Sequence, residues 1–215
     1  MTPHQASDAT LAWCRLAPVI PVLVIRDAAQ ALPLARALVA GGLPVLEVTL
    51  RTPAALKAIE AMAGVDGAVV GAGTVLTPAD AQAAQTAGAV FAVSPGATDR
   101  LLDACESRAL PLLPGAATAT EAMRLLERGY TTQKFFPAEV AGGTAALRAL
   151  GGPLPQIAFC PTGGVSPANA PGYLALANVA CVGGSWLAPA DLLAAGDWDA
   201  ITALARAAAQ LPRQG

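Results

Sequence analysis

Short apolar runs rich in β-favouring residues alternate with stretches of helical periodicity along the chain. The runs predict eight strands, at residues 18–25, 45–50, 68–73, 89–96, 110–115, 131–137, 156–164 and 179–187. The stretches between them predict helices, at residues 28–40, 53–62, 98–108, 144–150 and 197–211, from 118 or 120 to 129, and beginning at Pro78 and Pro167. A further helix is predicted at residues 4–15, ahead of the first strand.

This regular alternation implies parallel strands joined by right-handed crossovers. Eight such units within 215 residues predict a single-domain (β/α)8 TIM barrel at residues 18–215, preceded by an N-terminal helix within residues 1–17. An open, doubly wound sheet is the alternative architecture. In a barrel, active-site side chains gather at the carboxyl ends of the strands, so we expect the chemistry there.

Composition and charge argue against several classes of function. Hydrophobic residues make up 54% of the chain and charged residues 13%, which is typical of a globular protein with a large core. The formal net charge of -2 and the lack of a basic stripe argue against nucleic acid as a partner. The most apolar early run, Leu16 to Ile25, is too short and too rich in proline to span a membrane, and no secretory signal is expected.

Cysteine and histidine usage narrows the chemistry further. The four cysteines are widely spaced, without a C-x-x-C motif: Cys14, Cys105, Cys160 and Cys181. Free, buried thiols suit the reducing cytoplasm. The single histidine, His4, lies near the N-terminus, which argues against histidine-based metal sites and acid–base catalysis. We therefore expect neither a metal nor a cofactor.

The segment Thr131–Pro137 (TTQKFFP) places a lysine inside a predicted strand. Lys57, the chain's only other lysine, lies in an Ala-rich helical stretch typical of surface charge. Side chains alternate along a strand, so Lys134 shares a face with Phe136. If that face is a barrel interior, desolvation should lower the pKa of the amine and make it a nucleophile toward carbonyl groups. The alternative is a lysine at a strand end that extends its amine into solvent.

Two other early strands end in polar residues. Alternation along 45–50 puts Glu47 and Thr49 on one side, and Arg51 follows the strand. A glutamate inside an apolar strand is costly unless it is paired, so Glu47 is either functional, an ion-pair partner or a solvated residue at the rim. Arg51 is either functional or a surface charge. Thr74 follows the third strand and is either functional or a helix cap.

Glycine-rich turns follow the last two predicted strands, at Thr162–Gly164 and Gly183–Ser185, and Ser94–Gly96 ends the fourth. Phosphate sites in barrels often use the loops after the last two strands, where exposed N–H groups and a helix start hold the anion. Turns of this kind on both consecutive strands therefore indicate a phosphate site.

Together these residues predict a Schiff-base enzyme for a phosphorylated keto acid. An amine nucleophile needs a neighbouring carboxyl group to move protons during carbinolamine formation and dehydration, and Glu47 can supply it. Arg51 can bind a substrate carboxylate with its planar guanidinium. The glycine turns can bind a phosphate at the other end of the substrate.

Several motifs resemble the 2-keto-3-deoxy-6-phosphogluconate (KDPG) aldolase family, which also acts on 4-hydroxy-2-oxoglutarate (KHG). The resemblance runs from about residue 18 to 205 and rests on these segments: LVAGGLPVLEVTLRT, VGAGTVLTP, FAVSPG, KFFPAE, FCPTGGVSPAN and GGSW. It implies class I aldol cleavage to pyruvate and glyceraldehyde 3-phosphate, without a metal, by a cytoplasmic homotrimer of barrels.

The resemblance also assigns roles to individual positions. Lys134 in KFFPAE matches the Schiff-base lysine, and Glu47 in LEVTLRT matches the general acid–base. Arg51 matches a ligand of the pyruvyl carboxylate, and Thr74 matches a pyruvate contact. The remaining matches are substrate-binding positions, with Thr162 close to the reacting carbons and the rest in strand-end loops: Pro95, Thr162, Gly163, Gly164, Gly184 and Ser185.

Three other functions stay open at this point. The same fold could prefer the galactonate epimer, or 4-hydroxy-2-oxoglutarate, because one hydroxyl configuration cannot be read from sequence. A non-catalytic phosphosugar-binding barrel would keep the loops without needing Lys134 and Glu47. A metal-dependent epimerase or aldolase is disfavoured because the sequence contains no histidine besides His4.

Overall fold

The computed structural model describes residues 1–213; Gln214 and Gly215, the end of the predicted barrel at 18–215, lie outside the described residues. The strands are β1 (Val19–Leu23), β2 (Val45–Thr49), β3 (Val69–Gly73), β4 (Phe91–Val93), β5 (Leu112–Leu113), β6 (Gly115–Ala116), β7 (Thr132–Phe135), β8 (Ala158–Pro161) and β9 (Val182–Gly184). The helices are α1 (Pro3–Cys14), η1 (Ala28–Gln30, a 3-10 turn), α2 (Ala31–Ala40), α3 (Ala55–Ala63), α4 (Pro78–Thr86), α5 (Asp99–Ser107), α6 (Ala119–Arg128), α7 (Gly143–Gly151), α8 (Ala170–Leu174), α9 (Ala190–Ala195) and α10 (Trp198–Ala209).

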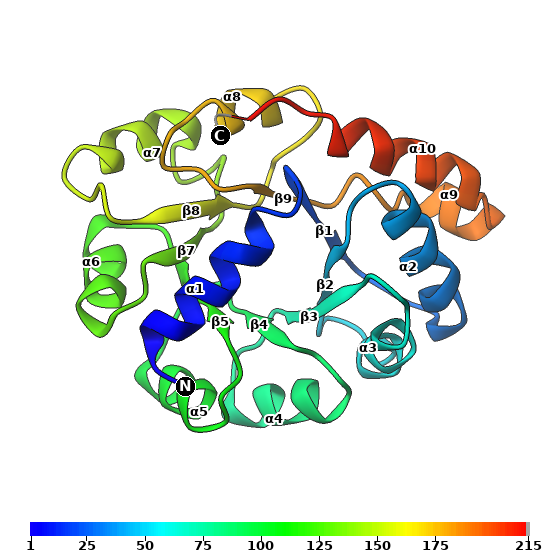
Figure 1. Cartoon of the computed structure of the whole chain (residues 1–215), viewed down its shortest axis with the longest axis horizontal. Helices are drawn as coiled ribbons and strands as arrows, with labels where there is room; N and C mark the ends of the chain where they lie inside the picture. Colours follow the sequence, from blue (N-terminus) through cyan, green and yellow to red (C-terminus); the bar gives the residue numbers. More distant parts are fainter. Residues whose placement is uncertain (214–215) are drawn as a thin grey trace.

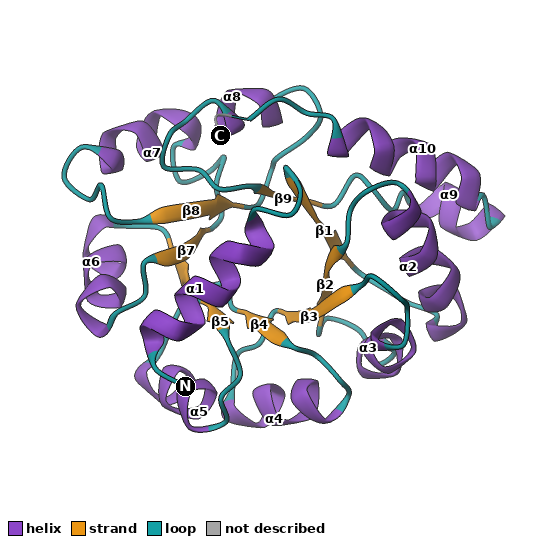
Figure 2. Ribbon diagram, viewed as in Figure 1, coloured by secondary structure: helices purple, strands orange, loops and turns teal. Residues whose placement is uncertain are grey.

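All the strand pairs are parallel, and they form two curled sheets. The larger has six strands in the order β5-β4-β3-β2-β1-β9, and the smaller has the order β6-β7-β8. Pro114, which lacks an N–H, separates β5 from β6. On the other side, single bridges join Phe159 to Val179 and Thr162 to Gly183. The strands lie around a common centre and the helices lie outside them, apart from α1 (Figures 1 and 2).

The α/β fold that the hydrophobic pattern predicts is therefore confirmed, with each predicted strand region containing observed strand. Some details were wrong. The fifth predicted strand is two short strands, the helix expected from Pro167 begins at Ala170, and α9 was not predicted. Of the two starts expected for the sixth helix, residue 118 is the one observed, because Thr118 caps α6 by accepting from the Glu121 N–H. Among residues 1–213, no helix has the length and apolar character that crossing a bilayer requires.

Alternation along the strands separates two apolar regions. Leu46, Val48 and Phe135 face outward and belong to the large core between strands and helices. The opposite faces point to the centre of the ring, here called the inner face, and contribute a second, smaller cluster. Its members are Cys14, Ile20, Val45, Phe91, Val93, Leu113, Cys160 and Cys181.

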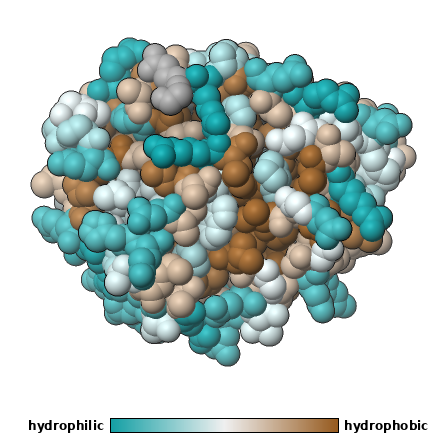
Figure 3. All heavy atoms as spheres, in the orientation of Figure 1, coloured by the Kyte–Doolittle hydropathy of each residue, from teal (hydrophilic) through white to brown (hydrophobic). Residues whose placement is uncertain are grey.

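Helix α1 covers the amino ends of the strands. It begins with a capping box between Thr2 and Gln5 and crosses the ring in Figure 1. Ser7 ties it to the start of β7, because its Oγ accepts from the Thr131 N–H at 2.9 Å and its carbonyl accepts from the Thr132 hydroxyl at 3.1 Å. Trp13 packs on Phe91 with ring centroids 5.2 Å apart. On this side of the molecule, hydrophobic residues gather near the middle and hydrophilic ones toward the edge (Figure 3).

Candidate active site

Lys134 and Glu47 meet on the inner face. The Lys134 Nζ donates to Glu47 Oε1 at 3.1 Å, although the two residues are 87 positions apart in sequence. Only 5% of Lys134 and 3% of Glu47 is exposed. The alternatives of a lysine that reaches solvent and a solvated glutamate at the rim are therefore wrong, because both head groups are removed from bulk water.

Glu47 lies in the middle of β2, facing Gly73 of the neighbouring strand. Thr49 and Gly73 are register partners, and a Cβ built on Gly73 would overlap the Glu47 carboxylate. Glycine at this position therefore makes the space that the carboxyl group occupies. Burial raises the pKa of Glu47 above its usual value, and the neighbouring Lys134 only partly opposes that shift. A carboxyl group of this kind holds a proton more readily than an exposed one, as a general acid requires.

Lys134 lies on β7 between two other strands of the smaller sheet. Its register partners are Gly115 on β6 and Cys160 on β8. The Lys134 Nζ lies 5.3 Å from the centroid of the Phe136 ring, on the face that the sequence pattern predicts for both residues. The amine is therefore held between a carboxylate and an aromatic ring, and the neighbouring Gly115 admits the backbone of Ser94 and Pro95.

Thr162 is another polar residue buried at this end of the inner face. It follows β8 directly and is bridged to Gly183 of β9. A Cβ on Gly183 would overlap the Thr162 hydroxyl, so this glycine admits Thr162 as Gly73 admits Glu47. The Thr162 Oγ1 lies 4.0 Å from the Cys160 Sγ, which places both residues next to the lysine strand.

The two glycine turns border the same end of the ring. Gly163 and Gly164 have φ of 100° and 79°, values that favour glycine. The turn packs against the loop after β7, where the Glu139 N–H donates to the Gly163 carbonyl at 3.1 Å. The Tyr173 hydroxyl of α8 in turn donates to the Glu139 carboxylate. At the other turn, Gly184 ends β9 and is buried, and Ser185 follows it and is exposed.

The remaining predicted residues differ in how closely they join this group. Thr74 has φ of 57°, an uncommon value for a β-branched residue and one found more often at functional sites. It is not the cap of α4, because that role belongs to Thr77. Pro95 is half-buried beside Gly115. Arg51 is exposed and forms no ion pair within residues 1–213, so the structure does not bring it to Glu47.

A large cavity lies nearby but is not centred on the amine. It has a volume of about 590 Å³, opens between α5 and α6, and is lined in part by Gly115, Arg124 and Arg128. Neither Lys134 nor Glu47 lines it. The buried pair, and not this cavity, brings an amine within hydrogen-bond distance of a carboxylate.

Sequence reasoning missed two features around the site. It did not foresee that Cys14, Cys160 and Cys181 converge, or that Tyr173 and Glu139 support the glycine turn. The register of β7 with β8 explains part of the cysteine convergence, because it places Cys160 opposite Lys134 on the inner face. Nothing in the local sequence around Tyr173 indicates its contact with Glu139, which lies 34 positions away.

A curled parallel sheet that buries a lysine beside a carboxyl group is the arrangement that a lyase working through an imine requires. A family model for KDPG and KHG aldolases matches residues 11–204. The chain belongs to this KDPG and KHG aldolase family. The 2-dehydro-3-deoxy-phosphogluconate aldolase of Pseudoalteromonas atlantica is 57% identical over 192 residues, which cover 89% of each protein.

Solved structures give the same result. The KDPG aldolase of Legionella pneumophila, with pyruvate captured as a covalent carbinolamine, is 49% identical with a TM-score of 0.90, over 93% of this chain and 98% of that one. The Zymomonas mobilis KDPG aldolase with 3-phosphoglycerate is 52% identical with a TM-score of 0.89. The match covers 94% of this chain and 95% of that one. The resemblance read from the motifs is thus confirmed at the level of the family.

Proposed function

We propose that this chain is a class I aldolase that cleaves 2-keto-3-deoxy-6-phosphogluconate to pyruvate and glyceraldehyde 3-phosphate through a Schiff base on Lys134. The observation that carries the proposal is the buried contact of 3.1 Å between the Lys134 amine and the Glu47 carboxylate. Family membership and the covalent pyruvate adduct of the Legionella relative support it.

Imine formation is the first chemical stage. The neutral Lys134 amine attacks the C2 ketone and gives a carbinolamine. Glu47 donates the proton that lets water leave, and the iminium forms. The raised pKa of Glu47 suits this step, because it favours the acid form that donates the proton. Burial of the pair limits competition from bulk water.

Carbon–carbon cleavage follows, with the iminium as the electron sink. Removal of the C4 hydroxyl proton forms the aldehyde, breaks the C3–C4 bond and leaves its electron pair in an enamine. Protonation of that enamine at C3 and hydrolysis of the iminium release pyruvate and regenerate the free amine. Glu47 is the titratable group within hydrogen-bond distance of the amine and therefore serves both proton-transfer stages.

Substrate binding is divided between the two ends of the ligand. We assign the phosphate to Gly163, Gly164, Gly184 and Ser185, whose turns follow β8 and β9. Thr162, Thr74 and Pro95 surround the pyruvyl half. Arg51 binds the carboxylate in this assignment, which requires its exposed side chain to turn toward the substrate.

The wider organisation follows from the same proposal. We infer that the two sheets act as one (β/α)8 barrel at residues 18–215, with residues 1–17 as a closing helix. Pairing of β1 with β9 and the bridges from β8 toward β9 support this arrangement. We also propose that the enzyme is a cytoplasmic homotrimer that requires no metal or cofactor. The four free thiols are compatible with that compartment.

A cleavage assay coupled to pyruvate detection tests the function. We expect KDPG to be cleaved in the presence of EDTA, with a higher kcat/KM than the galactonate epimer. The match to a family of KDPG and KHG aldolases also favours activity on 4-hydroxy-2-oxoglutarate, giving pyruvate and glyoxylate. A purified, folded chain that releases no pyruvate from any of the three compounds would be a binding protein instead.

A further inference from the structure

Three cysteines converge on the inner face, although they come from distant parts of the chain. Cys14 ends α1, Cys160 lies in β8, and Cys181 immediately precedes β9. Their sulfur atoms all lie within 4.8 Å of one another, and those of Cys160 and Cys181 are 3.5 Å apart. All three residues are buried, whereas Cys105 belongs to the outer core and is not part of this cluster.

We propose that this cluster, which the aldolase reaction does not use, is a binding site for a soft monovalent cation, Cu⁺, held by three sulfur ligands. Sulfur is the ligand that Cu⁺ prefers. With metal–sulfur bonds of about 2.3 Å, three sulfurs around one cation lie about 4 Å apart. The Cys160–Cys181 separation of 3.5 Å is below that value and the 4.8 Å limit on all three is above it, so side-chain adjustments of under about 1 Å would complete the site.

The number of ligands favours Cu⁺ over Zn²⁺. Structural zinc takes four ligands, and the nearest other donor that the structure gives is the Thr162 hydroxyl, 4.0 Å from the Cys160 sulfur. On the Cys14 side the surroundings are mostly apolar, with a cavity of about 10 Å³ beside Cys14 and Phe91. A three-coordinate d10 cation needs no fourth ligand from these walls.

The test uses the reduced, full-length chain under anaerobic conditions. Cu⁺ is supplied both to the native protein and during refolding. Slow entry of the ion into a buried site is then not mistaken for the lack of a site. Native mass spectrometry counts bound copper, competition with bathocuproine disulfonate gives affinity, and X-ray absorption counts sulfur ligands. We expect one tightly bound Cu⁺ per chain with three sulfur neighbours.

Cysteine-to-alanine variants identify the residues that bind the copper ion. Cys14→Ala and Cys181→Ala should each weaken binding at least about tenfold, the lower end of what loss of even an outer-shell partner costs a metal site. Cys105→Ala is the matched control, because it removes a buried thiol outside the cluster and should leave affinity unchanged. Circular dichroism and Tm of each variant verify folding, and the X-ray absorption result on the unaltered chain does not depend on any variant.

Several results would overturn the proposal. One is that the unaltered chain binds Cu⁺ no more tightly than Cys14→Ala or Cys181→Ala does. Another is that Cys105→Ala weakens binding as much as they do. A third is that X-ray absorption finds fewer than three sulfur atoms around the copper. A copper-treated chain that has lost two hydrogens and holds no metal would also overturn it, because the cluster would then form a disulfide.

Discussion

The two ends of the inner face are built by the same strands but have opposite character. Toward the carboxyl ends, the inner faces of β2 and β7 bring a carboxyl group and an amine within 3.1 Å. At the amino ends, α1 closes the ring with Trp13 packed on Phe91 among other apolar side chains. The difference suits the imine chemistry proposed above. The closed end packs apolar side chains that exclude water, and the open end carries the buried pair and the glycine turns.

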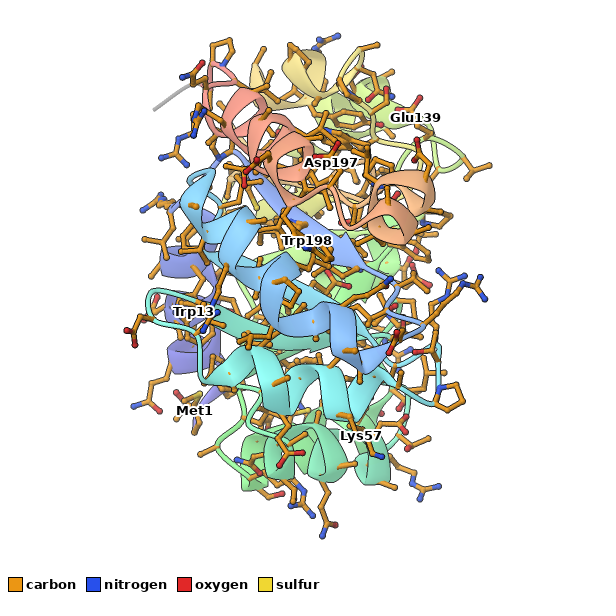
Figure 4. The ribbon with its side chains drawn as sticks, turned by 90° about the vertical axis from the view of Figure 1, so that its right-hand side faces the viewer. Met1, Trp13, Lys57, Glu139, Asp197 and Trp198 are labelled. Carbon is orange, nitrogen blue, oxygen red and sulfur yellow. The ribbon has the colours of Figure 1, made fainter. Side chains whose placement is uncertain are left out.

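Removing the amine should have the largest effect. We expect Lys134→Ala to lower kcat by about 10⁴-fold or more, because no other nucleophile lies at the open end to form the imine. Steady-state cleavage of KDPG measures the loss. Lys57→Ala is the matched control, because Lys57 is the only other lysine, is exposed and lies on α3 at the outer surface (Figure 4). A Lys134→Ala enzyme with substantial activity would place the chemistry elsewhere.

Removing the carboxyl group of Glu47 should have the second-largest effect on activity. Glu47→Gln should lower kcat about 10²–10⁴-fold, the usual contribution of one general acid–base, while slow imine formation with pyruvate persists. The ionisation with the raised pKa should also disappear from the pH–rate profile. Glu60→Gln, an exposed change on α3, should behave as the unaltered enzyme does. A Glu47→Gln enzyme with unchanged rates would remove Glu47 from the mechanism.

Gly73 gives a sharper test of the open end, because the residue itself has no chemistry. A Cβ there would overlap the Glu47 carboxylate, so Gly73→Ala should displace that group and lower kcat about 10²-fold. Gly64→Ala is the control, since a Cβ at Gly64 meets nothing within 4 Å and its φ of -86° suits alanine. If Gly73→Ala folds and turns over normally, the position of Glu47 does not limit the reaction.

The glycine turn after β8 should affect binding more than chemistry. Gly164→Ala puts a Cβ 2.6 Å from the Glu139 Cγ at a φ of +79°, which should shift the turn's N–H groups. We expect KM for KDPG to rise about tenfold, comparable to the loss of one hydrogen bond to a charged group. The unphosphorylated 4-hydroxy-2-oxoglutarate is the internal control. An equal rise in KM for both substrates would contradict a phosphate role.

The smallest effect concerns stability. Because the pKa of Glu47 is raised above its usual 4.5, the folded state holds this proton more tightly than the unfolded state does. That contribution is complete below the unfolded value and is lost as pH rises through the raised value. As pH rises between the unfolded and the folded pKa of Glu47, the free energy of unfolding of the unaltered chain should therefore fall relative to that of Glu47→Gln. The fall is about 1.4 kcal/mol for each tenfold difference in proton affinity between the folded and unfolded states. Urea titrations at several pH values measure it, and a difference independent of pH would contradict the raised pKa.

Much of the fold, and the strand faces on which the site residues lie, could be predicted from the sequence, because alternation and spacing are local signals. The strand residues placed Lys134 with Phe136 and placed Glu47 on the opposite face from Leu46, and both placements are confirmed. The break at Pro114 was harder, since proline within an apolar run is compatible with one strand or two. Helix α9 was missed because Ala190–Ala195 gives one and a half turns of pattern.

Contacts across strands could not be predicted in the same way. That Gly73 admits Glu47 and Gly183 admits Thr162 depends on register, which a single strand does not encode. The convergence of Cys14 with Cys160 depends on how α1 lies over the ring. Arg51 was assigned to the substrate from the motif, and that role stays a prediction, because its side chain is exposed without a bound substrate.

Reduction with borohydride in the presence of pyruvate tests the central claim most directly. The imine becomes a stable secondary amine, and peptide mass mapping locates it. We predict one pyruvate-derived adduct per chain, on Lys134, and none on Lys57. An adduct on Lys57 or the N-terminal amine, or no adduct with a fully folded chain, would contradict the account.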